Sequence, residues 1–494
     1  MKKGLAQVLF ANIIFLLVGI VSNFLLPKYL SIESYSYIKT YALYISYAGF
    51  FHLGYNDGMY LKYGGKKIEN ISKKDLSTNF LNYILVLLIA SIGLVIFGGI
   101  RKSFIMYAFA VGVFAANFIG YFKSFAQAIG EYNLYGKALN YEKILVLIFD
   151  FLLIFLCNTD NYKLYLSAQV LASIIIAVIL CYGVSRKTGI LKGGKFSISE
   201  IIINIRQGFI LMLGNFSSSI FTGMDRWFVK VLMNSFYFAQ YSFAVSVEQI
   251  INVFITPITV SMYNYFCRET NIDNIKKIKK FVLIWGCLII GGAFPLKFII
   301  EWILPKYKES SGLIFILFAA HAFYTVIKGI YVNYYKSKLL QKIYFWQLSG
   351  MTVVAFVTNC IAYYMLKSIY SFAFATLLTA LLWYIVCEIL TKELRSDIRE
   401  NIAFALMVSM YLVCGLKMNA IIGCICYVIA FGLILIFLTR DTLMEIIKEI
   451  KMICNKLLKK KENGYELFKR KDNINNRCNG AYWTSSNKRT FKNK

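Results

Sequence analysis

Charged side chains interrupt several long apolar stretches of this sequence. Lys39, Asp150, Arg226, Glu248 and Lys328 each lie inside a stretch that is otherwise apolar enough to cross a membrane. A charge at the centre of such a helix costs about 2.5–3.5 kcal/mol on insertion scales, so it needs a partner or a water-filled cavity. Lys and Arg bind phosphates, and a buried carboxylate can take up a proton or a cation. The charges predict a polar cavity between membrane helices; ion pairs that only hold helices together are the alternative.

The segment 208–263 has the clearest arrangement of polar residues. It predicts two membrane helices joined by a turn near Asn234, because each apolar stretch has about the length that a bilayer core of ~30 Å requires. Residues three or four apart share one face of a helix. One such face on the first helix carries Asn215, Ser219, Thr222, Arg226 and Lys230, with Asp225 beside it, and one on the second carries Glu248, Asn252, Thr256 and Thr259. Polar faces of this kind are tolerated in lipid where they line a cavity or meet a partner.

Two further segments predict polar faces. Lys39 and Asp57 lie on the same face of the predicted second helix, 18 residues apart, which corresponds to about 27 Å of helical rise. That face would extend through most of the membrane. His321, Thr325 and Lys328 share a face of a later helix. A single histidine in a membrane helix either titrates or serves as a packed hydrogen-bonding residue, and the sequence leaves both interpretations open.

The composition identifies the class of protein. Of 494 residues, 59% are hydrophobic and 16% are charged, and the mean hydropathy is +0.60, which is too apolar for a soluble protein of this length. The net charge of +29 does not indicate nucleic-acid binding, because the basic residues lie between apolar runs. The eleven cysteines and two histidines lack metal-site spacing, so we expect no metal or other cofactor.

Apolar runs predict an all-α polytopic membrane protein with about 14 transmembrane helices. After a first helix that ends near Pro27, the predicted spans are 36–58, 79–100, 103–128, 138–157, 162–184, 208–232, 237–264, 281–304, 311–335, 343–366, 369–391, 400–417 and 418–439. The predicted divisions are an N-terminal lobe (1–185), a cytoplasmic linker (186–207), a C-terminal lobe (208–392), two additional helices (393–440) and a basic cytoplasmic tail (441–494).

Basic residues in the connections predict the orientation, because Lys and Arg are enriched in cytoplasmic loops. The predicted outside loops hold only Lys28, Arg101, Lys102, Lys163, Lys306, Lys308, Lys367 and Lys417. The inside connections are much richer, and Lys277 and Lys279 belong to one of them. Both termini are then cytoplasmic, in a bacterial plasma membrane. Among the remaining charges, we interpret Lys123, Lys230 and Lys297 as snorkelling to the interface, and Glu301 and Glu388 as interfacial.

Two segments resemble a known family. LPKYLSIESYSYIKTYALYISYAGFFHLGYNDGMYLKYG is similar to the first two helices of the polysaccharide-repeat-unit flippases, and MDRWFVKVLMNSFYFAQYSFAVSVEQIINVFITPITVSMY to their seventh and eighth helices. These proteins belong to the multidrug/oligosaccharidyl-lipid/polysaccharide exporter superfamily. Ser36 and Ala239 stand where the family usually has glycine. The resemblance implies two six-helix lobes around a V-shaped cavity, with two additional C-terminal helices.

The resemblance also implies a function: export of an undecaprenyl-diphosphate-linked oligosaccharide by alternating access, without enzymatic chemistry, for cell-surface polysaccharide synthesis. Its partners would be the lipid-linked glycan, the bilayer, and a polysaccharide polymerase with glycosyltransferases. The substrate-binding candidates are Lys39, Asn215, Ser219, Thr222, Arg226 and Lys328, and the candidates for coupling to H⁺ or Na⁺ are Asp57, Asp150, Asp225 and Glu248. A drug or cation exporter of the same superfamily is the alternative, and an integral-membrane polymerase or acyltransferase a further one.

Overall fold

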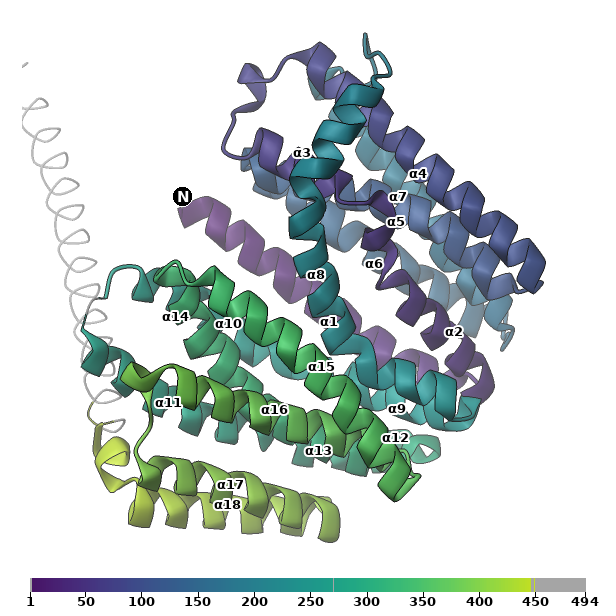
Figure 1. Cartoon of the computed structure of the whole chain (residues 1–494). Coiled ribbons are helices and arrows are strands. Elements are labelled where there is room, and N and C mark those ends of the chain that lie inside the picture. Colours follow the sequence, from purple (N-terminus) through teal and green to yellow (C-terminus); the bar gives the residue numbers. More distant parts are fainter. Residues whose placement is uncertain (1, 270, 446–447, 449–494) are drawn as a thin grey trace, which may run out of the picture.

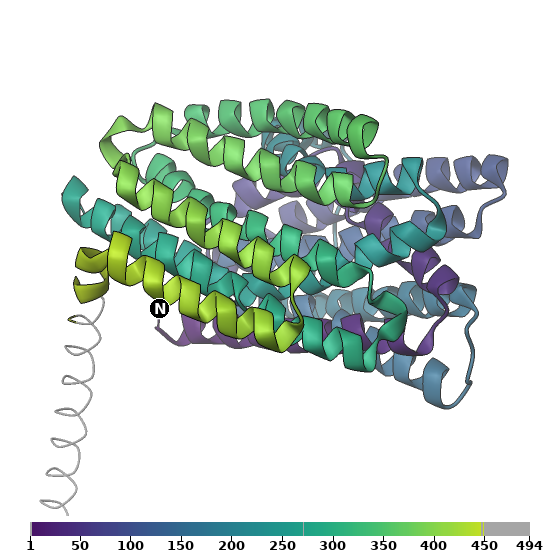
Figure 2. The ribbon, with the colours of Figure 1, turned by 90° about the horizontal axis from the view of Figure 1, so that it is seen from below.

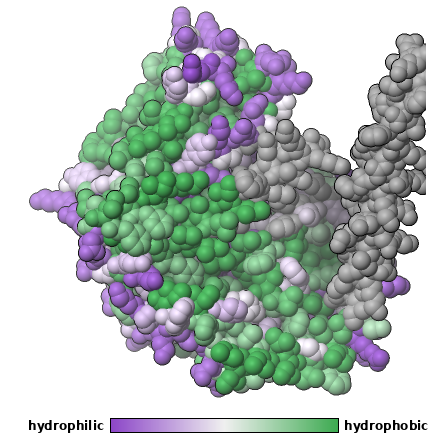
Figure 3. Space-filling model, turned by 180° about the vertical axis from the view of Figure 1, so that it is seen from behind, coloured by the Kyte–Doolittle hydropathy of each residue, from purple (hydrophilic) through white to green (hydrophobic). Residues whose placement is uncertain are grey.

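The protein is described by a computed structural model over residues 2–269, 271–445 and 448. Eleven helical segments of this part are long and apolar enough to cross a membrane. The other predicted spans, within 32–63, 132–155 and 198–232, are also helical but carry more charge or are interrupted. On the face that Figure 3 shows, hydrophobic residues cover much of the middle, and hydrophilic residues gather mainly at the top and along the left. The helical membrane architecture is confirmed, and the count of 14 spans stays a prediction.

The first seven long helices form the N-terminal lobe. Their bounds are α1 Lys2–Tyr29, α2 Ile32–Ile45, α3 Tyr55–Tyr63, α4 Lys73–Arg101, α5 Phe104–Ile129, α6 Tyr132–Phe155 and α7 Tyr162–Thr188. Helices suit these apolar runs because every backbone N–H and C=O must find a partner within the chain when lipid surrounds it. α5 lies at the centre of the lobe and contacts α2, α3, α4, α6 and α7.

The C-terminal lobe is built around α13. Its helices are α9 Ser235–Glu248, α10 Asn252–Phe266, α11 Ile272–Ile290, α12 Ala293–Ile303, α13 Ser310–Val326, α14 Val332–Ser337, α15 Gln341–Leu366 and α16 Tyr370–Leu390. Every side chain of α13 from Leu313 to Val326 is buried. α17 (Ile398–Lys417) and α18 (Ala420–Leu438) pack as a pair on the outside of this lobe (Figures 1 and 2).

The two lobes form a V. They are in contact where α2 packs on α9, and they diverge towards the end that holds the N-terminus (Figure 1). Aromatic rings fill the contact: the ring centroids of Tyr35 and Tyr307 lie 5.6 Å apart, and those of Phe24 and Phe243 lie 6.1 Å apart. The lobes thus have the V-shaped arrangement that the family resemblance implied.

The predicted second helix is broken, which corrects one expectation. α2 ends at Ile45, a short 3-10 turn covers Ala48–His52, and α3 begins at Tyr55. Leu53 and Gly54 both have left-handed backbone angles, with φ of 53° and 85°, which no continuous helix contains. The Gly54 N–H donates to Nδ1 of His52 at 3.1 Å. The continuous polar face predicted from Lys39 to Asp57 is therefore wrong, because the helix changes direction between them.

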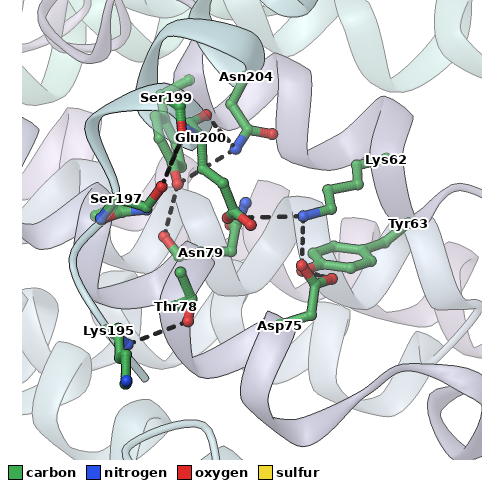
Figure 4. Close-up of polar contacts among 12 residues, drawn as sticks. Lys62, Tyr63, Asp75, Thr78, Asn79, Lys195, Ser197, Ser199, Glu200 and Asn204 are labelled. Atoms are coloured by element: carbon green, nitrogen blue, oxygen red, sulfur yellow. Dashed lines mark hydrogen bonds and ion pairs between the residues drawn. The ribbon is translucent and has the colours of Figure 1, made fainter. Parts of the chain in front are cut away.

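The linker between the lobes is shorter than predicted. α8 runs from Ile198 to Leu232, so the last ten residues of the predicted linker are helical. Hydrogen bonds and ion pairs tie its start to α3 and α4 (Figure 4): Lys195 N donates to the Thr78 hydroxyl at 3.2 Å, and Lys62 Nζ lies 2.6 Å from Asp75 and 4.0 Å from Glu200. The beginning of α8 thus packs with the N-terminal lobe.

A close helix crossing strengthens this attachment. A Cβ atom at Gly208 would lie 2.1 Å from the Gly54 carbonyl oxygen, and one at Gly58 would lie 2.0 Å from the Asn204 carbonyl oxygen. Only glycine permits this approach of α3 and α8. The later part of α8 instead packs on α15 and α16, so this helix connects the two lobes.

Candidate functional site

A cavity of about 370 Å³ lies within the C-terminal lobe, between α8, α9, α13, α15 and α16. Its polar lining comes from widely separated parts of the chain: Thr222, Asp225, Arg226, Ser246, Glu248, Gln249, Asn252, His321, Lys328, Asn359, Thr376 and Thr379. Thr222 and Arg226 both line the cavity because they lie one helical turn apart on α8. A cavity between membrane helices is a place where polar residues are tolerated.

Arg226 and its neighbour Asp225 do not neutralise each other directly. Asp225 is buried, and its carboxylate accepts hydrogen bonds from the Tyr241 hydroxyl and the Arg226 backbone N–H, both at 2.7 Å. The Arg226 Nε is buried without a hydrogen-bond partner. Among the described residues, no carboxylate lies within ion-pair distance of the Arg226 guanidinium. The guanidinium therefore retains donors for a ligand in the cavity.

Glu248 and Lys328 also line this cavity. The Nε2 atom of His321 contacts Oε1 of Glu248, so the histidine of α13 pairs with the carboxylate at the end of α9. Lys328 lies in a π-helical turn (Ile327–Tyr331), and its Nζ lies 5.3 Å from the centroid of the Tyr324 ring. π-turns inside α-helices are frequent at functional sites. His321 and Lys328 line the same cavity.

A second cavity of about 330 Å³ lies beside the N-terminal lobe and holds Lys39. The Lys39 Nζ donates to the Ser246 hydroxyl at 2.8 Å and lies 3.4 Å from the Asn23 Oδ1. The Asn23 amide in turn donates to the Ser246 carbonyl at 3.2 Å. Ser246 belongs to α9, whereas Asn23 and Lys39 belong to α1 and α2. These hydrogen bonds therefore join the two lobes across the V.

Asp150 lies in the same cavity as Lys39. Its side chain is buried, with 1% exposed, and neither carboxylate oxygen has a hydrogen-bond partner. Glu142, which also lines the cavity, accepts a hydrogen bond from the Ser173 hydroxyl at 2.5 Å, and Lys143 lines it as well. Burying a carboxylate without hydrogen bonds is costly. Asp150 is thus an unsatisfied acid in a cavity that also holds two lysines.

The two cavities meet at Ser246 and Gln249, which line both. Gln249 begins a 3-10 turn (Gln249–Ile251) that interrupts the helix between α9 and α10. Of the predicted site residues, the first cavity brings together Thr222, Asp225, Arg226, Glu248 and Lys328, and the second contains Lys39 and Asp150. The turn that begins at Gln249 therefore borders both groups of residues.

Three predicted residues lie elsewhere, at the contact of α8 with α3 and the preceding turn. The Asn215 amide donates to the Asp57 carboxylate at 3.2 Å, and the Tyr47 hydroxyl donates to the Ser219 carbonyl at 3.3 Å. Asp57 also lies 4.0 Å from the His52 ring. Asn215, Ser219 and Asp57 line neither cavity, and their contacts connect the middle of α8 to the N-terminal lobe.

The sequence interpretation missed the burial of Lys279 and Glu388. Lys279 was expected in a cytoplasmic connection and Glu388 at the interface, but both are buried and lie 2.5 Å apart. Residue spacing could not reveal this pair, because Lys279 belongs to α11 and Glu388 to α16. Asn23, Ser246 and Gln249 were missed for a similar reason, since their roles depend on which helices meet.

Comparisons with known proteins agree with this architecture. No protein-family model and no curated protein sequence matches the chain. Among solved structures, lipid II flippase MurJ in an inward closed conformation is similar, with a TM-score of 0.64 and 14% identity over 90% of this chain and 100% of that one. An inward-facing multidrug resistance MATE family transporter of the MOP superfamily has a TM-score of 0.57 and 12% identity over 77% of this chain and 95% of that one. The chain therefore shares the fold of these transporters.

Proposed function

We propose that the protein is a flippase for a lipid-linked oligosaccharide, with a diphosphate bound between Arg226, Lys328 and Lys39. The observation that carries the proposal is that Arg226 lines a cavity between the helices while its Nε lacks a hydrogen-bond partner. A guanidinium presents a planar pair of donors that matches phosphate oxygens, whereas the two lysines act as point charges. The fold that the chain shares with a lipid II flippase supports a lipid-linked substrate.

The proposed mechanism is alternating access of the two lobes. The diphosphate and sugars enter the V while the polyprenyl chain stays in lipid, so that protein cations replace the water around the headgroup. The hydrogen bonds from Asn23 and Lys39 to Ser246 hold the lobes together beside the cavities. A phosphate that binds Lys39 competes with the Ser246 hydroxyl for the ammonium, which links substrate binding to separation of the lobes. The partner polymerase and glycosyltransferases are part of the same proposal.

Reconstitution tests this function directly. Purified protein in liposomes should move an undecaprenyl-diphosphate-linked oligosaccharide between leaflets, measured as the fraction of glycan accessible to an external glycosidase. Liposomes with Arg226→Ala protein are the matched control. Uptake of a cationic dye without glycan transfer would instead favour the drug-exporter alternative, which the carboxylates Asp225, Glu248 and Asp150 would serve.

The proposed orientation places both termini in the cytoplasm, so that the V opens inwards. Single cysteines at positions 234 and 417 should react with an impermeant maleimide added to intact cells, whereas a cysteine at position 277 should react only after the membrane is opened. Lys277 is half-exposed at the end that holds the N-terminus and lies 3.6 Å from Glu445. Strong labelling of position 277 from outside would reverse the orientation.

A further inference from the structure

A third and larger space lies outside both cavities. This groove, of about 1110 Å³, is formed by the loop after α14, the first half of α15 and the end of α16. These elements lie towards the end of the C-terminal lobe that is nearer the N-terminus (Figure 1). Its walls are mainly apolar or aromatic and include Tyr334, Ile343, Trp346, Met351, Val386 and Leu390. The groove therefore has the lining expected for an apolar ligand.

Several polar groups that line the groove already have hydrogen-bond partners within the protein. The Tyr335 hydroxyl lies 2.6 Å from the Thr391 hydroxyl and accepts a hydrogen bond from the Gln347 amide at 3.0 Å. The carboxylate of Glu393 accepts a hydrogen bond from the Tyr334 hydroxyl at 2.6 Å. These groups have partners without a ligand, so the body of the ligand need not be polar.

The rim of the groove is basic. Lys338, Lys342 and Lys392 line it and are exposed. None of them has a carboxylate within ion-pair distance in the part of the chain that the structure describes. Glu393 is the acidic residue of the lining, and its contact is with Tyr334. A basic rim beside an apolar trough complements a molecule with an anionic head and a hydrocarbon chain.

The exposed residues around the groove indicate the depth at which it sits. Trp346 is 72% exposed and Leu390 is 60% exposed, so both project away from the helix bundle. Tryptophan and lysine are enriched where a membrane protein crosses from hydrocarbon to headgroups. These residue types around the groove are those expected at the level of the headgroups and upper acyl chains of one leaflet.

We propose that this groove is a binding site for one anionic phospholipid of that leaflet. The phosphate of the headgroup lies among Lys338, Lys342 and Lys392, and one acyl chain runs along α15 past Ile343 and Trp346. The site is separate from the two cavities and does not depend on the proposed transport function. It would keep a bilayer lipid attached to the junction of α14, α15 and α16.

Native mass spectrometry of the full-length protein tests the site, with phosphatidylglycerol and phosphatidylcholine as probes. The wild type should retain phosphatidylglycerol preferentially. The variant Lys338→Gln/Lys342→Gln/Lys392→Gln should retain it about tenfold less, since each basic residue near a membrane surface strengthens binding to anionic lipid. The matched control is Lys66→Gln/Lys67→Gln/Lys74→Gln, which removes three exposed lysines from the other lobe and should retain the lipid as the wild type does.

A second variant tests the apolar part of the groove without changing charge. Gly350 lines the groove, and a Cβ atom there would meet no atom within 4 Å. Gly350→Phe should therefore fold and fill the trough, and should lower retention of phosphatidylglycerol to a similar extent. Thermal unfolding midpoints equal to that of the wild type verify folding of all variants.

Three results would overturn the proposal. If the groove variant and the control variant lose phosphatidylglycerol equally, the lipid is retained by general surface charge and not by the groove. Normal retention in Gly350→Phe would place the lipid outside the trough. Displacement of phosphatidylglycerol by a polyprenyl diphosphate at equal concentration would show that the groove holds the carrier lipid rather than a bilayer phospholipid.

Discussion

The C-terminal lobe contains two groups of buried charge that differ in how completely they are satisfied. In the first group, the Lys279 Nζ donates to Glu388 at 2.5 Å, to the Tyr331 hydroxyl at 2.6 Å and to the Leu394 carbonyl at 2.6 Å. The second oxygen of Glu388 accepts the Ser396 backbone N–H at 2.8 Å. In the second group, around the cavity, the Arg226 Nε and the His321 Nδ1 have no partner.

This difference separates a structural role from a binding role. An ammonium has three donors, and all three of Lys279 are used by the protein. Such a network joins α11, α16 and the loop before α17 and leaves nothing for a ligand. A buried donor without a partner is costly, and we interpret the cost at Arg226 as the basis of substrate binding.

The largest effect on stability is expected at the buried ion pair of Lys279 and Glu388. Lys279→Met should lower the free energy of unfolding by about 3–5 kcal/mol, because it leaves the Glu388 carboxylate buried without its cation. The thermal unfolding midpoint of the purified protein, followed by tryptophan fluorescence in detergent, measures this effect. The double variant Lys279→Met/Glu388→Leu should recover most of the loss, since both charges are removed together. A single variant as stable as the wild type would contradict the structural role.

Arg226 should show the opposite behaviour, with a large effect on transport and a small one on stability. Arg226→Ala should lower glycan transfer by about 10–100-fold, as expected when a charged hydrogen-bonding group is lost. Arg226→Lys should retain part of the activity, because a lysine supplies charge without the planar fork. Lys230→Ala is the matched control, since this lysine lies on the same helix against the Phe238 ring.

Abundance in the membrane decides between the two interpretations of Arg226. If the guanidinium only compensates the charge of Asp225, Arg226→Ala will lower the amount of folded protein. Normal abundance together with normal glycan transfer would contradict both interpretations.

The sequence was sufficient for the class of fold and for most of the cavity charges. Apolar runs of membrane length require helices, and a charge inside such a run is expensive, so Arg226, Lys328, Glu248 and Asp150 stand out without a structure. Helical spacing also grouped Thr222 with Arg226. These are local properties of one helix, and they can be inferred from one segment at a time.

Contacts between helices could not be predicted in the same way. Lys279 and Glu388 are more than a hundred residues apart, and only the packing of α11 against the end of α16 makes them a pair. The break between α2 and α3 was missed because its residues, including Leu53, are ordinary for a membrane helix. The unexpected role of Ser246 likewise depends on the contact of α9 with α1 and α2.

Lys39 tests whether the second cavity shares the binding role of the first. Lys39→Ala should lower glycan transfer less than Arg226→Ala, because a point charge makes less specific contacts with a phosphate than a guanidinium does. Ser246→Ala removes the hydroxyl that holds Lys39 across the lobes and leaves the ammonium with the Asn23 Oδ1, 3.4 Å away, as its acceptor. It should weaken the contact between the lobes while keeping substrate binding. A loss of binding in Ser246→Ala equal to that in Lys39→Ala would show that the bridge itself forms the site.

The smallest change in structure and the most selective change in function are expected at Asp150. We propose that Asp150 or Glu248 responds to a coupling proton or sodium ion, because a carboxylate in a medium of low dielectric favours its neutral form and can cycle with hydration. Glu248 already contacts His321, whereas both oxygens of Asp150 lack partners. Lys39, Lys143 and Glu142 are the other charged groups that line its cavity.

This arrangement makes Asp150 the stronger of the two candidates. Asp150→Asn preserves shape and removes only the exchangeable charge, so protein abundance should stay normal while the dependence of glycan transfer on a pH or sodium gradient is lost. Glu248→Gln should retain that dependence if its role is to position His321. Transfer measured in liposomes with imposed gradients distinguishes the two variants. If both keep the gradient dependence of the wild type, neither carboxylate couples transport to an ion, and Asp150 belongs with Lys279 and Glu388 among the structural charges.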